Sequence, residues 1–413
     1  MPVAGSLPGD CRRMTDRTLL YTNAFLRAFA TGLIGVALGI YLSLLKLSPV
    51  AVGHIVTAGL TGAALASAAA TLLADRCGRR RSLIALSLLG ALGATGVSLS
   101  SSPWLLAGAA LVGMLNGMGR DRGAALILDQ AILPAVTADR ERTNAFAVYN
   151  VCQDVGHAMG SLVAGVPAIV ESGGWGPLGT QRAGYQAALA GYALLAFISA
   201  GLYRRLSAAV EPHPPLGRRR VSPATRRVLW RMSSLFAIDS LGGGFLTTTL
   251  LTYYFFERFS APPAVIAVLF FVSRVANAAS HLGAAWLARR IGLVNTMVFT
   301  HIPSSLLLVS VAFAPNFPVA AVLFVLRESL VEMDVPTRQS YVMALVRPEE
   351  RTLASGVTNL VRMAGWAVAP AVAGLFMQST TLSAPLFIGA GLKIAYDVTL
   401  YRAFSRVKPP EEL

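Results

Sequence analysis

Leu73-Ala-Asp-Arg-Cys-Gly-Arg-Arg-Arg81 is a short, strongly basic turn between two long apolar runs. Four arginines are difficult to move across a bilayer, so we expect this turn to stay on the cytoplasmic side of a membrane. The second half of the chain carries a shorter basic turn at the corresponding place, Leu287-Ala-Arg-Arg-Ile-Gly292. A charged turn that recurs after half the chain predicts a membrane protein built from two related halves.

The composition favours the same class of protein. Of 413 residues, 54% are hydrophobic and only 13% are charged, whereas a soluble domain carries about 25% charged residues. The net charge of +15 would indicate a nucleic-acid partner in a soluble protein. In a membrane protein, Arg-rich cytoplasmic loops explain it, so no nucleic-acid partner is expected. The three cysteines are far apart in the sequence and predict neither a disulfide framework nor a metal site. We expect no cofactor.

Apolar runs long enough to span a bilayer occur about twelve times. The connectors between them alternate between Arg-rich and nearly Arg-free segments, which places both termini in the cytoplasm and supports the number of spans. The predicted spans are 18–45, 50–74, 82–101, 103–133, 143–171, 182–204, 229–256, 263–288, 293–314, 316–346, 352–378 and 382–404.

A linker rich in proline and arginine, residues 205–228, divides the spans into two bundles, 18–204 and 229–404, with tails at 1–17 and 405–413. The halves also resemble each other in sequence. Glu141-Arg-Thr-Asn-Ala-Phe-Ala-Val-Tyr-Asn150 aligns without a gap with Glu350-Arg-Thr-Leu-Ala-Ser-Gly-Val-Thr-Asn359. The pattern predicts an all-α membrane protein of two six-helix bundles related by a parallel repeat, with the axis along the membrane normal.

At this point the chain resembles the transporters of the major facilitator superfamily. Thr71-Leu-Leu-Ala-Asp-Arg-Cys-Gly-Arg-Arg80 is similar to that superfamily's motif Gly-x-x-x-Asp-Arg-x-Gly-Arg-Arg, with Thr71 in place of the first glycine. The resemblance implies the twelve-helix fold of that superfamily in a cell membrane, inner or plasma. It implies a gating role in a cytoplasmic charge network for Asp75, Arg76 and Arg79, with Gly78 at the turn. A looser similarity to drug and sugar-efflux proton antiporters implies efflux.

Ionisable side chains within a span are costly unless they face a cavity or a partner, so each is a candidate functional residue. The resemblance implies that helices 1, 4, 7 and 10 line a central cavity. Asp129 and Arg338 lie near the cytoplasmic ends of their helices and are expected to act as gate residues. The expected cavity residues are Asn23, Arg27, Arg120, Asp121, Arg122, Asp239, Arg327, Glu328, Asp334 and Arg362.

Arg27 and Asp239 occupy equivalent positions in the first and seventh spans. Their opposite charges can pair across the cavity in one state of a transport cycle, or form a permanent structural ion pair. Removal of either partner is then expected to be strongly destabilising. On helix 10, Pro336 between Asp334 and Arg338 is expected to kink or open the helix.

Asp154 and His157 are three residues apart on the fifth span and share a helix face. A buried carboxylate beside an imidazole is suited to proton transfer, although the same pair can instead join two helices by a hydrogen bond. Asp154, His157, Asp239 and Asp121 are the expected proton-coupling residues.

The sequence therefore predicts a secondary transporter rather than an enzyme. We expect a monomer in the bilayer that exports a small organic molecule against a proton or other ion gradient. The alternative is an uptake carrier or uniporter for an anionic metabolite, bound by arginines such as Arg120 and Arg362. A third reading, a membrane protein that does not transport, is disfavoured because the predicted soluble segments are too short for a signalling domain.

Overall fold

The computed structural model describes residues 15–137, 142–172, 181–211, 222–334, 338 and 351–404. All regular elements in these ranges are helices, as expected from the apolar runs. The expected tails lie almost entirely outside the described residues, as does the middle of the expected linker. Pro336 and the continuation of the tenth span towards residue 346 also lie outside them.

The N-terminal bundle begins with a long helix capped by the Thr15 hydroxyl, which accepts from the Thr18 amide. The second helix begins at a Ser48 cap followed by Pro49, a residue favoured in a first helical turn. The helices of this bundle are α1 (Asp16–Leu44), α2 (Pro49–Cys77), α3 (Arg79–Leu99), α4 (Pro103–Gly113), α5 (Ala124–Ile132), α6 (Arg142–Val163), α7 (Val166–Ser172) and α8 (Gln181–Tyr203).

The C-terminal bundle repeats this organisation after a short 3₁₀ helix, η2 (Ala208–Val210). Its helices are α9 (Pro223–Gly244), α10 (Thr248–Phe259), α11 (Pro263–Ile291), α12 (Leu293–Ala312), α13 (Phe317–Val331), α15 (Arg351–Ser379) and α16 (Ala384–Phe404). Eight stretches of the described residues are long and apolar enough to cross a membrane. The other four expected spans correspond to α4 with α5, α6 with α7, α13, and α16.

Three expected spans are interrupted. The fourth is non-helical between Gly113 and Ala124, the fifth between α6 and α7, and the seventh between Gly244 and Thr248. Glycines are dense at the first and third of these breaks, and glycine destabilises a helix interior. The Thr247 hydroxyl then restarts the seventh span by capping α10. In the tenth span, α13 ends at Val331, and most of the remainder of the predicted span lies outside the described residues.

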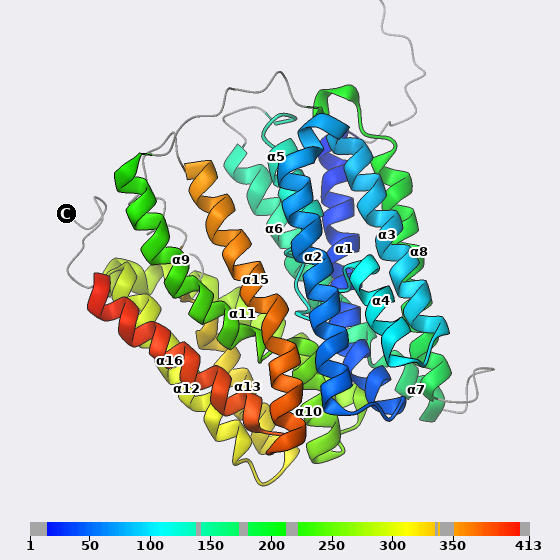
Figure 1. Ribbon diagram of the computed structural model, residues 1–413, viewed down its shortest axis with the longest axis vertical. Helices are drawn as coiled ribbons and strands as arrows, with labels where there is room; N and C mark the ends of the chain where they lie inside the picture. The colour runs from blue at the N-terminus through cyan, green and yellow to red at the C-terminus, as the bar shows by residue number, and fades with distance from the viewer. Residues whose placement is uncertain are drawn as a thin grey trace, which may run out of the picture.

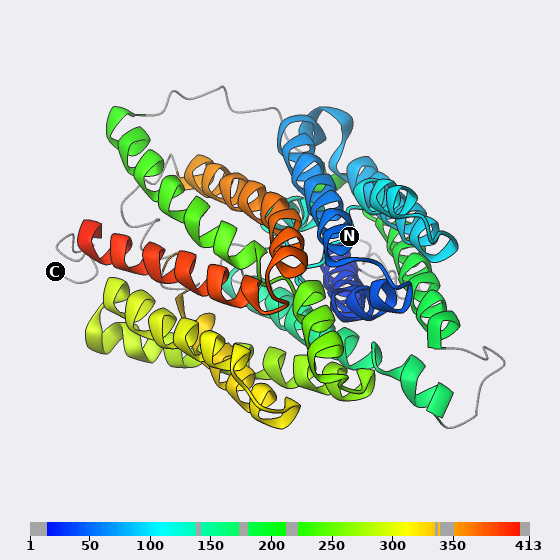
Figure 2. The ribbon, with the colours of Figure 1, turned by 60° about the horizontal axis from the view of Figure 1, so that its bottom comes forward.

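The two bundles approach each other closely at one end of the molecule. We call the end with the α2–α3 and α11–α12 turns the basic end, and the other the opposite end. In Figures 1 and 2, the basic ends of α2 and α9 lie far apart, whereas α2, α10 and α15 come together towards the opposite end. Across the bundle interface α2 packs on α15, α1 on α10, and α6 on α11. The conformation is therefore closed at the opposite end and open towards the basic end.

Small residues allow this close approach. A Cβ atom at Gly53 of α2 would lie 2.4 Å from the Pro370 carbonyl oxygen of α15, and one at Gly374 would lie 2.3 Å from the Pro49 carbonyl oxygen. Farther along the interface, the Thr249 amide of α10 donates to the Gly117 carbonyl at 3.0 Å. The bundles thus pack backbone against backbone, as small residues permit between membrane helices.

The aromatic side chains at the end of the seventh span pack within their own bundle. Tyr254 and Phe255 are buried and make edge contacts with their neighbours on α10, α11 and α13, among them Phe259, Phe270 and Phe324. They form a packed aromatic cluster inside the C-terminal bundle.

Candidate functional site

A cavity of about 750 Å³ lies between the two bundles. Its lining is strongly charged, with seven arginine and lysine side chains and four acidic ones. It includes most of the expected cavity residues: Arg120, Arg122, Asp239, Arg327, Glu328, Asp334 and Arg362. It also includes Arg338, expected as a gate residue, and five residues absent from the expected set: Arg274, His301, Glu332, Trp366 and Lys393.

The interruption of the fourth span forms one wall of this cavity. The Asn116 side chain holds the non-helical backbone, because its amide donates to the Arg120 carbonyl at 2.5 Å and its oxygen accepts from the Met118 amide at 2.9 Å. Gly119 has a φ of +67°, a conformation that favours glycine. The wall also contacts the other bundle, since the Thr248 hydroxyl donates to the Met118 carbonyl at 2.8 Å.

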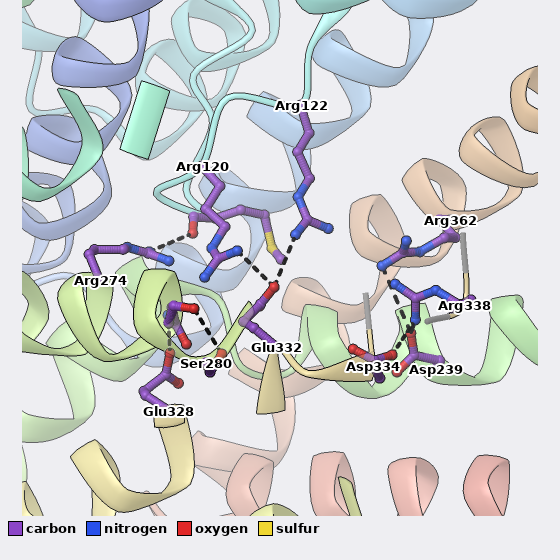
Figure 3. A network of polar contacts seen from close by, with 12 residues as sticks. Arg120, Arg122, Asp239, Arg274, Ser280, Glu328, Glu332, Asp334, Arg338 and Arg362 are labelled. Carbon is purple, nitrogen blue, oxygen red and sulfur yellow. Dashed lines mark hydrogen bonds and ion pairs between the residues drawn. The ribbon is translucent and has the colours of Figure 1, made fainter. Parts of the chain in front are cut away.

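Arg120 and Arg122 project from this wall to a glutamate of the C-terminal bundle (Figure 3). Glu332, which follows the last residue of α13, forms an ion pair with Arg120 at 2.8 Å and lies 3.9 Å from Arg122. Beside them, Arg274 of α11 donates to the Thr248 hydroxyl at 3.0 Å and has no ion-pair partner among the described residues. We refer to Arg120, Arg122, Arg274 and Glu332 as the bridging cluster.

Trp366 of α15 connects the bridging cluster to the rest of the cavity. The guanidinium carbons of Arg122 and Arg362 each lie 4.8 Å from the centre of its ring. Such contacts are favourable cation–π interactions. An arginine from each bundle thus contacts the same indole.

A second charged group, the Asp239 cluster, lies on the other side of the cavity. Asp239 of α9 pairs with Lys393 at 3.0 Å and with Arg338 at 3.2 Å, and Arg338 pairs with Asp334 at 2.6 Å. The cluster continues away from the cavity, because the Lys393 ammonium lies 3.2 Å from His301 Nε2 and His301 Nδ1 lies 2.9 Å from Asp397. We define the cluster as Asp239, Asp334, Arg338, Lys393, His301 and Asp397.

Glu328 and Arg327 occupy a third position on the cavity wall. They pair with each other on α13, and the Asn277 amide of α11 donates to Glu328 at 2.8 Å. All three residues belong to the C-terminal bundle, so these contacts do not cross the bundle interface.

Arg27 and Asp239 do not pair in this conformation. Arg27 is held inside the N-terminal bundle by Asp121 at 3.0 Å and Asp129 at 2.8 Å, and also by the hydroxyls of Tyr149 and Tyr203. Equivalent positions in the two repeats therefore have different partners. Two side chains at the same depth in the membrane therefore need not line the same cavity.

Three expected cavity residues lie away from the central cavity. Asn23 is fully buried, and its side-chain amide donates back to the Leu19 carbonyl. Arg27 and Asp121 line a separate cavity of about 730 Å³ inside the N-terminal bundle. Asp129 is also fully buried, where it accepts from the Tyr149 hydroxyl at 3.0 Å. Because its contacts with described residues all lie within one bundle, the gate role of Asp129 stays a prediction.

Asp154 and His157 occupy different environments on α6. Asp154 is exposed, whereas His157 is buried and its Nε2 accepts from the Asp121 backbone amide at 2.7 Å. The imidazole thus helps to hold the wall of the fourth span. A joint role of these two residues in proton transfer, one of the two readings that the sequence leaves open, stays a prediction.

The basic motif forms the expected turn between α2 and α3. Gly78 has a φ of +94°, and Arg79 pairs with Asp75 at 2.9 Å and donates to the Ala131 carbonyl at 3.2 Å. Glu211 closes the turn by accepting from the Arg79 amide at 2.7 Å. Arg76 is exposed. The described contacts of the motif are with the N-terminal bundle and with linker residues such as Glu211, at the end where the bundles are apart.

The residues that sequence reasoning missed carried a visible signal. Arg274, Lys393 and Asp397 are ionisable side chains inside predicted spans, which is itself an indication of function. They lie on the eighth and twelfth spans, outside the helices that the resemblance places at the cavity. His301 is an isolated histidine in the sequence, and only the fold shows that it contacts Lys393 and Asp397.

Comparisons with known proteins agree with this architecture. An uncharacterized membrane protein of Saccharomyces cerevisiae, YJR124C, is 24% identical over 417 residues and covers 93% of each chain. The crystal structure of the nucleoside transporter NupG superposes with a TM-score of 0.72 at 18% identity, covering 96% of this chain and 100% of that one. A partially occluded inward-open conformation of the xylose transporter XylE from E. coli gives a TM-score of 0.71 at 12% identity, covering 96% and 98%.

The profile of the Major Facilitator Superfamily matches residues 20–370, which is most of the chain. The match, the structural similarity and the two-bundle fold agree with the expectation from the basic motif. The chain is a multi-pass membrane protein that belongs to the Major Facilitator Superfamily, and it is a transporter rather than an enzyme.

Proposed function

We propose that this transporter carries a small organic anion by alternating access. The observation that carries the proposal is the excess of arginine and lysine around the central cavity. An uncompensated charge is costly in a site shielded from water. An anion that enters the cavity relieves that cost, whereas an organic cation increases it.

The unsatisfied hydrogen-bond donors in the cavity support an anionic substrate. The Nε atoms of Arg274, Arg327 and Arg362 are buried and have no hydrogen-bond partner among the described residues. Guanidinium groups bind carboxylate or phosphate through paired hydrogen bonds, which give geometric specificity as well as affinity. The cavity charge thus favours the anionic alternative among the two readings from the sequence.

The arrangement of charged loops supports an orientation with the basic end in the cytoplasm. The conformation described here would then be open to the cytoplasm and closed to the other side. In the opposite phase of the cycle, Asp75, Arg76 and Arg79 would act at the basic end, in the gating role that the motif implies. We propose the inner or plasma membrane as the location, with a monomer as the transporting unit.

Proteoliposomes containing the purified chain test the proposal. Radiolabelled succinate and phosphate, a sugar and a lipophilic cation would each be assayed for counterflow, with inside-out and right-side-out populations separated to give the direction of transport. We expect counterflow of an anion only, and about a hundredfold loss with Arg362→Ala, because a charge-assisted contact is worth about 1.5–3 kcal/mol. The exposed Arg231→Gln is the matched control. Transport of the cation or sugar, with no anion transported, would contradict the proposal.

We further propose that transport is coupled to protons through the Asp239 cluster. The specific observation is the continuous line from Asp239 through Lys393 and His301 to Asp397. A carboxylate accepts and an ammonium donates, so the neutral ring of His301 would carry its proton on Nδ1. Asp239, Lys393 and His301 line the cavity, so the line would exchange protons with whichever side of the membrane the cavity faces.

The coupling proposal predicts separate effects on proton flux and on exchange. In the same proteoliposomes, with a pH-sensitive dye inside, His301→Gln should leave anion exchange measurable while it abolishes the proton movement that accompanies net transport. Asp239→Asn should have the same effect. Proton movement that persists in both variants would exclude this cluster. Asp121 and Asp154 would then remain as the acidic residues expected to couple transport to protons.

A further inference from the structure

In the bridging cluster, the carboxylate of a glutamate side chain already binds arginines that face the cavity. Glu332 lies 2.8 Å from Arg120 and 3.9 Å from Arg122, which belong to the other bundle. The three side chains are partly exposed, at 15–23%. Glu332 lines the cavity together with Arg120, Arg122 and Arg274, so an anion that enters the cavity can reach the same guanidinium groups.

The charge of this cluster is not balanced by Glu332 alone. Three guanidinium groups, those of Arg120, Arg122 and Arg274, share one carboxylate within the cluster. Arg274 has no ion pair of its own among the described residues, and its Nε has no hydrogen-bond partner. The cluster can therefore accommodate more negative charge than Glu332 supplies, such as a second carboxylate or a phosphate.

The neighbouring acidic residue on the same helix differs in its contacts. Glu328, one turn before Glu332, is bound to Arg327 and to the Asn277 amide, both of the C-terminal bundle. Asp239 and Asp334 also pair with residues of that bundle. Of the four acidic residues in the cavity lining, Glu332 is the one whose described ion pairs cross from one bundle to the other.

We infer that Glu332 occupies, in the empty transporter, the position that an anionic group of the substrate takes when it binds. The inference rests on the proposed transport of an organic anion and names the subsite within that cavity. The entering carboxylate or phosphate binds Arg120, Arg122 and Arg274 and displaces Glu332. Displacement breaks the ionic contact between the bundles, so the event that binds the substrate also releases a restraint on their movement.

This role makes a prediction that distinguishes Glu332 from an ordinary structural residue. Removing the internal competitor should tighten anion binding, whereas removing a structural ion-pair partner should weaken it. Because Glu332 rebinds the arginines as the anion leaves, its loss should also slow release. Both KM and kcat of transport should therefore fall, since stronger ground-state binding does not accelerate the cycle.

Calorimetric titration of the purified full chain with succinate and with inorganic phosphate, at fixed ionic strength, tests the inference. We expect Glu332→Gln and Glu332→Ala to bind the preferred anion about tenfold more tightly than the wild type, equivalent to about 1.4 kcal/mol. Glu328→Gln removes the same charge from the same helix face and should change the affinity much less. Thermal unfolding of each variant verifies that it is folded.

The possible results separate the inference from the proposed function. Binding by the wild type with unchanged affinity in both Glu332 variants overturns the inference and leaves anion transport in place. Equal tightening in Glu328→Gln also overturns it, because the effect would then be the general charge of the cavity. Binding only by the Glu332 variants supports it. No binding of either anion by any variant overturns the proposed function and the inference with it.

Discussion

Buried charged residues have different surroundings in the two bundles. In the N-terminal bundle, Arg27 neutralises Asp121 and Asp129 away from the central cavity. In the C-terminal bundle, Asp239 is surrounded by cations that line the cavity. A buried ion pair contributes little net stability, but removal of one partner leaves an uncompensated charge. We therefore expect the first group to stabilise the fold and the second to serve transport.

Replacing Arg27 by methionine tests this division. Asp129 is fully buried, so Arg27→Met should lower the free energy of unfolding by about 3–5 kcal/mol. The double variant Arg27→Met with Asp129→Asn also removes the charge of the fully buried carboxylate but leaves Asp121, so it should recover part of that loss. Thermal unfolding in detergent measures both. An unchanged unfolding temperature in the single variant would contradict the role assigned to Arg27.

Sequence reasoning identified the charged side chains better than their partners. Periodicity places Arg27 and Asp239 at similar heights in their spans, but the partner of each depends on how its helix is rotated and on its neighbours. Arg27 meets two aspartates and two tyrosines from α5, α6, α8 and the wall of the fourth span, none of which its own helix specifies. Glu332 was missed for the same reason, since its partners lie on the other bundle.

The helices can be predicted from the lengths of the apolar runs, whereas the breaks within the spans cannot. The ends of α2, α3, α8 and α16 fall within a few residues of the predicted spans. The fourth span was predicted as one helix because its composition is apolar throughout, apart from the charges near residue 120. Its glycines and Asn116 make the break possible, but contacts with Thr248 and Thr249 of the other bundle favour it. Sequence alone does not show such contacts.

The wall of the fourth span should be sensitive at Asn116. Asn116→Ala removes two hydrogen bonds that hold residues 116–120 in position, and each is worth about 0.5–1.5 kcal/mol. Because Arg120 lies at the end of this segment, we expect KM for the anion to rise about tenfold with a small loss of stability. Counterflow kinetics and thermal unfolding measure the two effects. A large loss of stability with an unchanged KM would contradict a positioning role.

The contact of α2 with α15 is expected to favour the conformation closed at the opposite end. A side chain at Gly53 meets the Pro370 backbone, so Gly53→Val should weaken this closure. In a background without native cysteines, Leu251→Cys lines the cavity and reports access from the opposite end to an impermeant thiol reagent. We expect labelling several times faster with Gly53→Val. Gly108→Val is the matched control, because a Cβ atom there meets nothing within 4 Å. Equal labelling rates in the Gly53→Val and Gly108→Val variants would contradict a role of the α2–α15 contact in closure.

At the scale of the whole molecule, the two bundles have become unequal in function. The repeat preserves the fold and the basic turns, while most ionisable side chains of the central cavity come from the C-terminal bundle. The N-terminal bundle contributes Arg120 and Arg122 from the wall of its fourth span. Anion binding at the bridging cluster therefore depends on both bundles, and a substrate held there is sensitive to their relative position.

Alternating access by these bundles can be measured directly as a change in distance. Spin labels at the exposed positions 76 and 231 report the separation at the basic end, and labels at 104 and 313 report the opposite end. A saturating transported anion should shorten the first distance and lengthen the second, because an anion that displaces Glu332 removes an ionic contact between the bundles. Glu332→Gln should show part of the same shift without ligand. Distances that stay fixed at both ends while the anion binds would mean that binding and bundle movement are not linked through this contact.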